Sequence, residues 1–214
     1  MKKLLFTLLV VISLFQIYGC NNSLNSKISS NISELQNQYF YFEDDELAVS
    51  LISGNRESYY SLDGKSTNLK TYCVLMVEQT TFKEIKNLSV FINEKEFNIT
   101  PLLNPYNNNY VYDFETQINS SDAIKLKIFD KEIDLENKIC NFKLSAKDCL
   151  NLAIKENKNA LKLLCNKNAF SGEVFIRIVK IKSYDLFVYQ ILFVDENHNT
   201  IQCLVNPITK KILK

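Results

Sequence analysis

Apolar and polar residues alternate along much of the stretch from Tyr39 to Leu135, and this period of two residues restricts the chain to β-structure there. Successive side chains of a strand point to opposite faces, so alternation gives each strand one apolar face. The clearest case is Ile124–Ile128, in which three apolar residues alternate with two lysines. Comparable short segments are Leu47–Ile52, Leu88–Ile92, Glu96–Ile99, Tyr110–Phe114 and Ile133–Leu135. Tyr72–Val77 is instead a short apolar run, which predicts a strand buried on both faces. We therefore predict an antiparallel β-sandwich-like domain over residues 39–140.

Turn residues separate these segments and predict how they connect. Asn93-Glu94-Lys95 and Asp130-Lys131-Glu132 each lie between two apolar segments, which indicates two hairpins. Residues 100–109 contain two prolines and a run of asparagines, so we predict a loop between strands there.

The pattern changes near Lys143. Ser145 and Asp148 have the spacing of a capping box, and apolar residues then recur at helical spacing as far as Ile154. The apolar residues from Leu161 to Cys165 either continue this helix or form a second short one. Three strand-like segments follow and a short edge segment closes the chain: Glu173–Ile181, Leu186–Val194, Thr200–Val205 and Ile212–Leu213. This order predicts a small α+β domain over residues 143–214, a helix followed by an antiparallel meander, so the whole protein should be mainly β.

The first twenty residues have the layout of an export signal. Two lysines precede an apolar stretch that is too short to span a bilayer comfortably, and Gly19 stands directly before Cys20. The segment Ile17-Tyr18-Gly19-Cys20 resembles the lipobox of bacterial lipoproteins, although Tyr18 is bulkier than the usual small residue. The resemblance implies a signal peptide over residues 1–19 and a lipid-modified Cys20 at the mature N-terminus. It also implies an extracytoplasmic protein that is lipid-anchored to the bacterial cell membrane.

Residues 20–38 are rich in asparagine and serine and contain few apolar residues. We predict that they form a tether, which would hold the folded part away from the membrane.

The C-terminal part resembles a PepSY-type domain. The helix SAKDCLNLAIKEN, the strand pair LFVYQILFVDENHNTIQCLV and the closing NPITKKIL carry the resemblance. Thr209 and the apolar pair Ile212-Leu213 match the family's usual ending, whereas Asn206 and Lys210 replace its aspartate and glycine. Because that family has been associated with restraint of peptidases, the resemblance implies an envelope protein or peptidase as a partner.

Charge excludes one class of partner. The chain has 25 basic and 24 acidic residues without a block of like charge, so we expect no nucleic-acid surface.

The five cysteines after Cys20 are an odd number and lack metal-site spacing. We expect Cys73, Cys140, Cys149, Cys165 and Cys203 to be buried free thiols, with one disulfide in the C-terminal half as the alternative.

Few residues qualify as site candidates. Arg56 and Glu57 follow Gly54-Asn55 and form either a ligand-facing pair or an ordinary loop ion pair. Tyr106 and Tyr110 flank an asparagine run and are the aromatic residues that we expect to be exposed, where they could line a peptide or carbohydrate surface.

Two clusters of polar residues have a structural explanation. The acidic run Glu43–Glu46 lacks the ligand spacing of a calcium loop, so we interpret it as a solvated strand end. The residues from Asp195 to His198 are typical of a hairpin turn. We find no catalytic motif and expect no cofactor and no metal.

These observations favour a non-enzymatic protein- or peptide-binding module at the cell envelope, acting by strand addition to an exposed sheet edge. The alternatives are an envelope hydrolase whose residues converge only in the folded chain, and a lipoprotein that binds a small ligand such as a carbohydrate or another solute.

Overall fold

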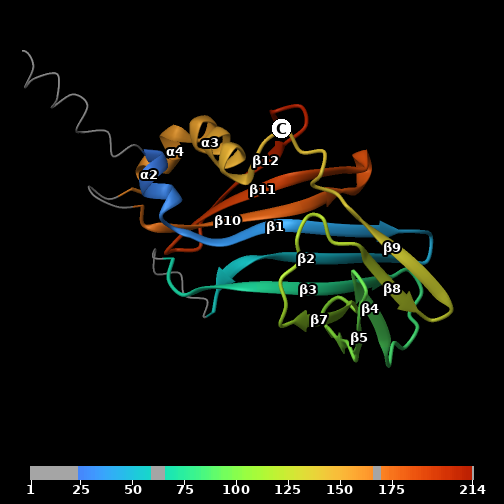
Figure 1. Cartoon of the computed structure of the whole chain (residues 1–214). Coiled ribbons are helices and arrows are strands. Elements are labelled where there is room, and N and C mark those ends of the chain that lie inside the picture. Colours follow the sequence, from blue (N-terminus) through green and yellow to red (C-terminus); the bar gives the residue numbers. More distant parts are fainter. Residues whose placement is uncertain (1–23, 59–65, 166–169, 214) are drawn as a thin grey trace, which may run out of the picture.

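The fold is seen in a computed structural model of the chain, which describes residues 24–58, 66–165 and 170–213 (Figure 1). The predicted signal peptide and Cys20 lie outside the described residues. Strands make up most of the described chain, which confirms the prediction of a mainly β protein. The helical elements are α2 (Leu24–Ser29), α3 (Ala146–Glu156), α4 (Lys158–Leu163) and the 3-10 turn η1 (Lys182–Tyr184).

Thirteen strands are described. The first seven are β1 (Ile32–Glu43), β2 (Leu47–Glu57), β3 (Leu69–Gln79), β4 (Leu88–Ile92), β5 (Lys95–Ile99), β6 (Leu102–Leu103) and β7 (Tyr110–Phe114). The others are β8 (Ile124–Ile128), β9 (Lys131–Asn137), β10 (Gly172–Ile181), β11 (Leu186–Asp195), β12 (Thr200–Asn206) and β13 (Lys211–Leu213). Both predicted hairpins, β4–β5 and β8–β9, are confirmed, whereas the predicted loop over residues 100–109 contains the two-residue strand β6.

The strands form one curved network. Nine of them lie side by side in the order β13-β12-β11-β10-β1-β2-β3-β7-β6, and β9 connects β1 to the small group formed by β8, β4 and β5. All described pairings are antiparallel except that of β1 with β10. The predicted division between residues 140 and 143 falls after β9, yet β1 and β10 pair across it, so strands from both sides share one sheet.

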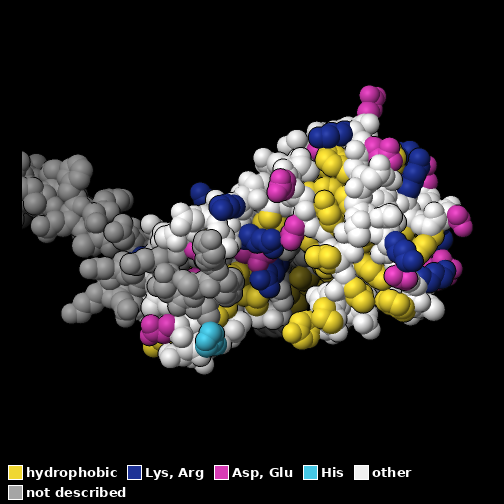
Figure 2. All heavy atoms as spheres, turned by 90° about the horizontal axis from the view of Figure 1, so that it is seen from below, with side chains coloured by type: hydrophobic (Ala, Val, Ile, Leu, Met, Phe, Trp, Pro, Cys, Tyr) yellow, Lys and Arg dark blue, Asp and Glu magenta, His cyan; other side chains and the backbone are white. Residues whose placement is uncertain are grey.

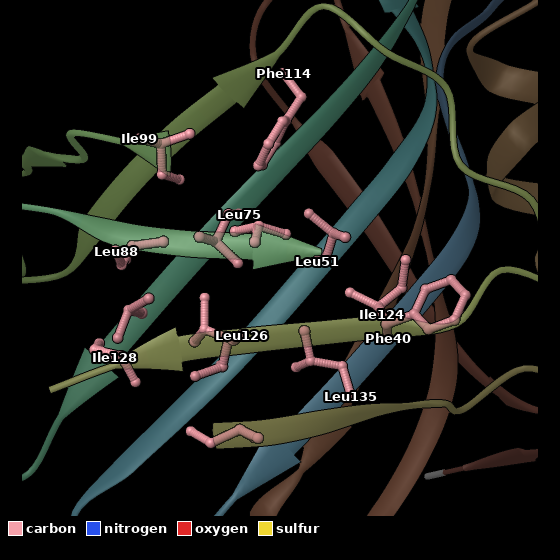
Figure 3. Close-up of a cluster of buried hydrophobic side chains, with 14 of the residues drawn as sticks. Phe40, Leu51, Leu75, Leu88, Ile99, Phe114, Ile124, Leu126, Ile128 and Leu135 are labelled. Atoms are coloured by element: carbon pink, nitrogen blue, oxygen red, sulfur yellow. The ribbon is translucent and has the colours of Figure 1, made fainter. Parts of the chain in front are cut away.

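The first core lies between the strands of the N-terminal part. Apolar side chains from β1, β2, β3 and β7 meet those from β4, β5, β8 and β9 (Figure 3). Leu51, Leu75 and Leu126 are completely buried there. This packing explains the alternation in the sequence, because the lysines of β8 lie on its exposed face.

The second core lies under the helices. In Figure 1, α2, α3 and α4 lie together over β10, β11 and β12. Cys149, Leu150, Ala153 and Ile154 form the buried face of α3. The predicted capping box is confirmed, because the Ser145 side chain accepts from the Asp148 backbone and the Asp148 side chain accepts from the Ser145 backbone. The residues after Glu156 form a second short helix, α4, rather than a continuation of α3.

The predicted tether differs from the structure over residues 24–38, because these residues belong to the fold. They form α2 and the first half of β1, and Ile28 is completely buried in the second core. Asn31 donates from Nδ2 to the carbonyls of Phe170 and Gly172, at 2.8 and 3.0 Å. The polar side chain of Asn31 therefore satisfies buried backbone carbonyls, whereas the tether prediction placed it in solvent.

The five cysteines that the structure describes are free thiols. Cys73, Cys149 and Cys203 are buried as expected, Cys165 is half-buried, and Cys140 is exposed. Burial raises the pKa of Cys73 and of Cys149 to about 12, so both thiols stay protonated at neutral pH. Among the described residues, no helix is long and apolar enough to cross a membrane.

Candidate functional site

Strand β3 extends beyond its neighbour β7 and leaves part of its edge open. β7 pairs with Cys73–Val77, whereas Leu69–Tyr72 pair only with β2 among the described residues. Leu69, Lys70 and Thr71 are exposed. Alternate residues of a paired strand direct their N–H and C=O groups away from the partner, so residues 69–72 have backbone groups that no described strand on the β7 side pairs with.

Thr200–Cys203 of β12 likewise pair only with β11 among the described residues, and the remaining edge strands are shorter or more strongly charged. β6 has two residues and β13 has three, and short edge strands leave little backbone for pairing. β5 presents Lys95 and Glu96 at its exposed end, and edge charges discourage pairing. We treat the open edge of β3, residues 69–72, as the candidate site because Thr71 and Tyr72 line a hollow beside it.

A hollow of about 510 Å³ adjoins this edge. Its lining residues are Arg56, Thr71, Tyr72, Asp113, Phe114, Glu115, Thr116 and Gln117. They come from the ends of β2, β3 and β7 and from the segment that follows β7. Figure 2 shows a hollow on the face seen from below, where side chains of both charges lie among hydrophobic ones. A site of this kind offers backbone groups, charge and apolar surface together.

Arg56 is the central charged residue of the hollow. Its guanidinium lies 3.3 Å from the Asp113 carboxylate and 4.5 Å from the centre of the Tyr72 ring. The side chains of Arg56 and Asp113 are 47% and 68% exposed, so both charges remain accessible to a ligand. The Tyr72 ring stabilises this position of the guanidinium, because the face of an aromatic ring attracts positive charge.

Tyr72 connects this hollow to the interior of the sheet. Its hydroxyl donates to Oε1 of Glu34 at 2.9 Å, and Glu34 also forms an ion pair with Arg177 at 2.6 Å. Burial raises the pKa of Tyr72, and the nearby Glu34 charge raises it further. Arg56 and Arg177 are the two arginines of the chain, and they lie at opposite ends of this one polar network.

Arg56 and Glu57 do not form the pair that the sequence predicted, neither as a ligand-facing pair nor as a loop ion pair. Both belong to the end of β2 rather than to a loop, so consecutive side chains point to opposite faces of the sheet. Glu57 instead accepts a hydrogen bond from the Thr67 backbone at 2.5 Å. Glu57 stabilises the connection between β2 and β3, and it does not line the hollow.

The two tyrosine candidates have different environments. Tyr106 is 96% exposed, as predicted. The prediction for Tyr110 was wrong: it is buried in the first core, and its hydroxyl accepts a hydrogen bond from the Ile85 backbone at 3.2 Å. Tyr110 begins β7, and the β-sheet alternation turns its ring inward.

Carboxylates of the acidic run at the β1–β2 turn form ion pairs with lysines. Lys131 lies 2.9 Å from Asp44 and 2.7 Å from Glu46, and Lys180 pairs with Glu43. Within the described ranges, no group of three or more His, Cys, Asp or Glu side chains could hold a metal ion.

The other polar cluster is a hairpin turn, as predicted. Asp195 accepts hydrogen bonds from the backbones of Asn197 and Asn199, at 2.9 and 2.8 Å. His198 is exposed and has a positive φ of 63°, which is typical of a turn.

The candidate site offers charged side chains and a backbone edge to a ligand. Elsewhere in the described chain, hydrogen bonds from lysines, from the Ser145 and Asn199 side chains and from backbone amides lower the pKa of several carboxylates. Arg56 supplies a fixed cation, Asp113 an anion and β3 a free backbone edge. Sequence reasoning identified Arg56 but missed Glu34, Tyr72, Asp113 and Arg177, because strand register alone brings them together.

No family model matches the sequence, and no curated protein or solved structure is significantly similar to it.

Proposed function

We propose that the protein is a lipid-anchored, non-enzymatic binding module of the bacterial cell envelope, which captures an extended segment of a partner protein at the open edge of β3. The observation that supports this proposal is the length of β3, which continues for four residues past β7 beside a hollow with both charges. Main-chain hydrogen bonds would provide affinity, and the side chains of the hollow would provide specificity.

The charges of the hollow define the partner segment. Arg56 and Asp113 are close enough to neutralise each other, and their side chains are 47% and 68% exposed. A segment with an acidic side chain opposite Arg56 and a basic one opposite Asp113 would replace this weak surface pair by two pairs. We infer that the partner is an envelope protein or peptidase with such an extended segment.

The anchor is a separate part of the proposal. It is supported by the basic, apolar and small-residue pattern that ends at Cys20. Several acyl chains on one cysteine would hold the domain at the membrane, since each buried CH₂ contributes about 0.8 kcal/mol. A Cys20→Ala variant should lose metabolic lipid labelling and move to the soluble fraction, and a variant that remains in the membrane would refute the anchor.

A photo-crosslinker at the edge tests the binding proposal. Thr71 is replaced by p-benzoylphenylalanine in living cells, and Glu96 on the outer edge of β5 serves as the matched control. We expect a specific adduct only from Thr71, and mass spectrometry identifies the partner. A synthetic peptide from the crosslinked segment should then bind the purified protein.

Arg56→Glu sharpens this test. It reverses the charge at position 56, so it should lower the affinity for the peptide at least tenfold, whereas Lys95→Glu should leave the affinity unchanged. Equal crosslinking from Thr71 and Glu96, or equal affinity in both charge variants, would overturn the proposal.

A second hollow favours the small-ligand alternative. It has a volume of about 520 Å³ and lies where β9, the segment after it and β11 meet. Phe187 packs edge-on against Tyr41 in its wall, with ring centres 5.2 Å apart, beside the Lys180–Glu43 ion pair. Aromatic rings next to fixed charges suit a sugar or another polar solute. A thermal-shift screen with sugars checks this alternative, because ligand at 100 times Kd stabilises the fold by about 2.7 kcal/mol.

A further inference from the structure

A groove of about 890 Å³ is lined by residues of α2, α3 and α4. These three helices lie together on one side of the sheet (Figure 1). The two walls of the groove are connected, because Nδ2 of Asn25 in α2 donates to Oδ1 of Asn151 in α3 at 2.9 Å. The apolar residues that line it are Leu24, Leu144, Leu152 and Ile154. The groove therefore has an apolar floor within a helical frame.

Four lysines surround this floor: Lys155, Lys158, Lys162 and Lys210. All four are exposed, and within the part of the chain that the structure describes none forms an ion pair with a carboxylate. Asp148 is the acidic residue of the lining, and its carboxylate accepts hydrogen bonds from the Ser145 backbone and hydroxyl, at 3.2 and 2.6 Å. The rim therefore carries a net positive charge that faces solvent.

An exposed apolar side chain stands beside the rim. Leu163 ends α4, directly after Lys162, and is 86% exposed. Leu161 on the same helix is completely buried, so α4 presents lysines and one leucine outward. Lysines combined with an exposed leucine are typical of helices that lie at a membrane surface.

The sequence places this groove close to the proposed anchor. Leu24 begins α2 and lines the groove, and Cys20 precedes it by only four positions. A fully extended chain spans at most about 3.6 Å per residue, so the two residues are separated by no more than about 14 Å. An acylated Cys20 would therefore hold the start of α2 within about 14 Å of the anchored residue.

We propose that the lysine groove binds the phosphate headgroups of anionic phospholipids in the membrane that holds the anchor, so that the helices face the bilayer. This inference rests on the proposed lipid anchor for its geometry. The lysines contact the phosphates, and Leu163 enters the headgroup region. The domain is then docked on the membrane rather than suspended above it.

The contribution of the groove lysines to membrane affinity is large enough to measure. A lysine near an anionic bilayer strengthens binding roughly fivefold, so three lysines account for roughly a hundredfold. The attraction falls with salt, because the screening length is about 10 Å at 0.1 M ionic strength.

Lysine footprinting of the processed full chain tests the proposal. The protein is purified from cell membranes and placed in nanodiscs of phosphatidylcholine alone or of phosphatidylcholine with phosphatidylglycerol. Limited acetylation followed by mass spectrometry then measures the reactivity of each lysine. We expect several-fold lower labelling of Lys155, Lys158 and Lys162 in the anionic discs only, with Lys95 unchanged in both.

A charge-reversal variant with a matched control tests whether the groove lysines cause the protection in anionic discs. Lys155→Glu, Lys158→Glu and Lys162→Glu are combined in one chain, and Lys83→Glu, Lys86→Glu and Lys95→Glu in the other, so both lose the same charge. The remaining groove lysine, Lys210, should lose its protection in the first chain and keep it in the second. Equal labelling in both kinds of disc, or equal protection by soluble inorganic phosphate alone, would overturn the proposal.

The mass of the N-terminal peptide separates this inference from the anchor. A mature chain without acyl mass at Cys20 would refute the anchor, and flotation of that unacylated protein with anionic vesicles would then decide about the groove. Salt-sensitive flotation would support headgroup binding, whereas the absence of flotation would overturn it.

Discussion

Oε2 of Glu34 in β1 lies 2.7 Å from Nε and 2.6 Å from Nη2 of Arg177 in β10. The two residues are 143 positions apart, and their ion pair bridges the parallel junction that connects both parts of the sheet. The Glu34 side chain is only 13% exposed. The pair therefore neutralises a carboxylate at the point where the two parts meet.

Removal of Arg177 should weaken this junction. Arg177→Met leaves the Glu34 carboxylate largely buried without its cation, so we expect the free energy of unfolding to fall by about 1–3 kcal/mol. Urea unfolding measures the change. Lys125→Met breaks exposed ion pairs on β8 and should change stability by no more than about 0.5 kcal/mol. Glu34→Gln combined with Arg177→Met should recover part of the loss, and failure to do so would argue against a pairwise interaction.

Gly54 should tolerate no side chain. A Cβ atom at this position would lie 2.1 Å from the Leu35 carbonyl oxygen and 2.9 Å from Cα of Gln36, where the register of β1 shifts. We expect Gly54→Ala to lower the free energy of unfolding by about 3 kcal/mol, since the obstacle is backbone. Ser53→Ala is the matched control, because the Ser53 hydroxyl is buried without a hydrogen-bond partner among the described residues. Equal stability of both variants would contradict the close approach of β1 and β2.

The Asp44–Lys131 pair should make stability depend on pH. Hydrogen bonds from Lys131 and from the Leu47 and Glu46 backbones lower the pKa of Asp44 to about 2. The folded protein thus binds the Asp44 proton less readily than the unfolded chain, for which the ordinary value is 3.8. The stabilisation is complete above pH 4 and disappears as the pH falls through 2.

Asp44→Asn tests this pH dependence. It should be less stable than the wild type at pH 7, and most of this difference should be lost at pH 2, as measured by urea unfolding at both values. Asp45→Asn changes an exposed neighbour without an ion pair in the described chain and should show no such dependence. A constant difference between wild type and Asp44→Asn across this range would rule out the proposed linkage.

Local patterns in the sequence were sufficient to predict the local elements. The Ser145–Asp148 spacing located the start of α3, and alternation located the strands of the first core. The parallel pairing of β1 with β10 could not be predicted in this way, because the local sequence of neither strand indicates which distant strand it pairs with. Residues 24–38 were misinterpreted for a related reason: Asn31 bonds to carbonyls near position 170, and its polarity suggested solvent instead.

The candidate site was predictable only in part. Arg56 stood out as one of two arginines, yet its partners Tyr72 and Asp113 lie in other strands and are fixed by register. Tyr110 was predicted to be exposed because a loop sequence precedes it. It is the first residue of β7, however, and the strand directs its side chain inward.

Tyr110 and Tyr106 should respond differently to substitution, although both flank the same asparagine-rich segment. The Tyr110 hydroxyl is the acceptor for the buried Ile85 N–H, and its ring stacks on Phe82 with centres 6.2 Å apart. Tyr110→Phe retains the ring and removes the acceptor, so the free energy of unfolding should fall by about 1–2 kcal/mol. Tyr106→Ser changes a side chain that is 96% exposed and should alter stability by no more than about 0.5 kcal/mol. Thermal and urea unfolding measure both. Amide exchange at Ile85 gives a local check, because a faster rate in Tyr110→Phe alone assigns the loss to this hydrogen bond, and an unchanged rate would show that Tyr110 acts only through its ring.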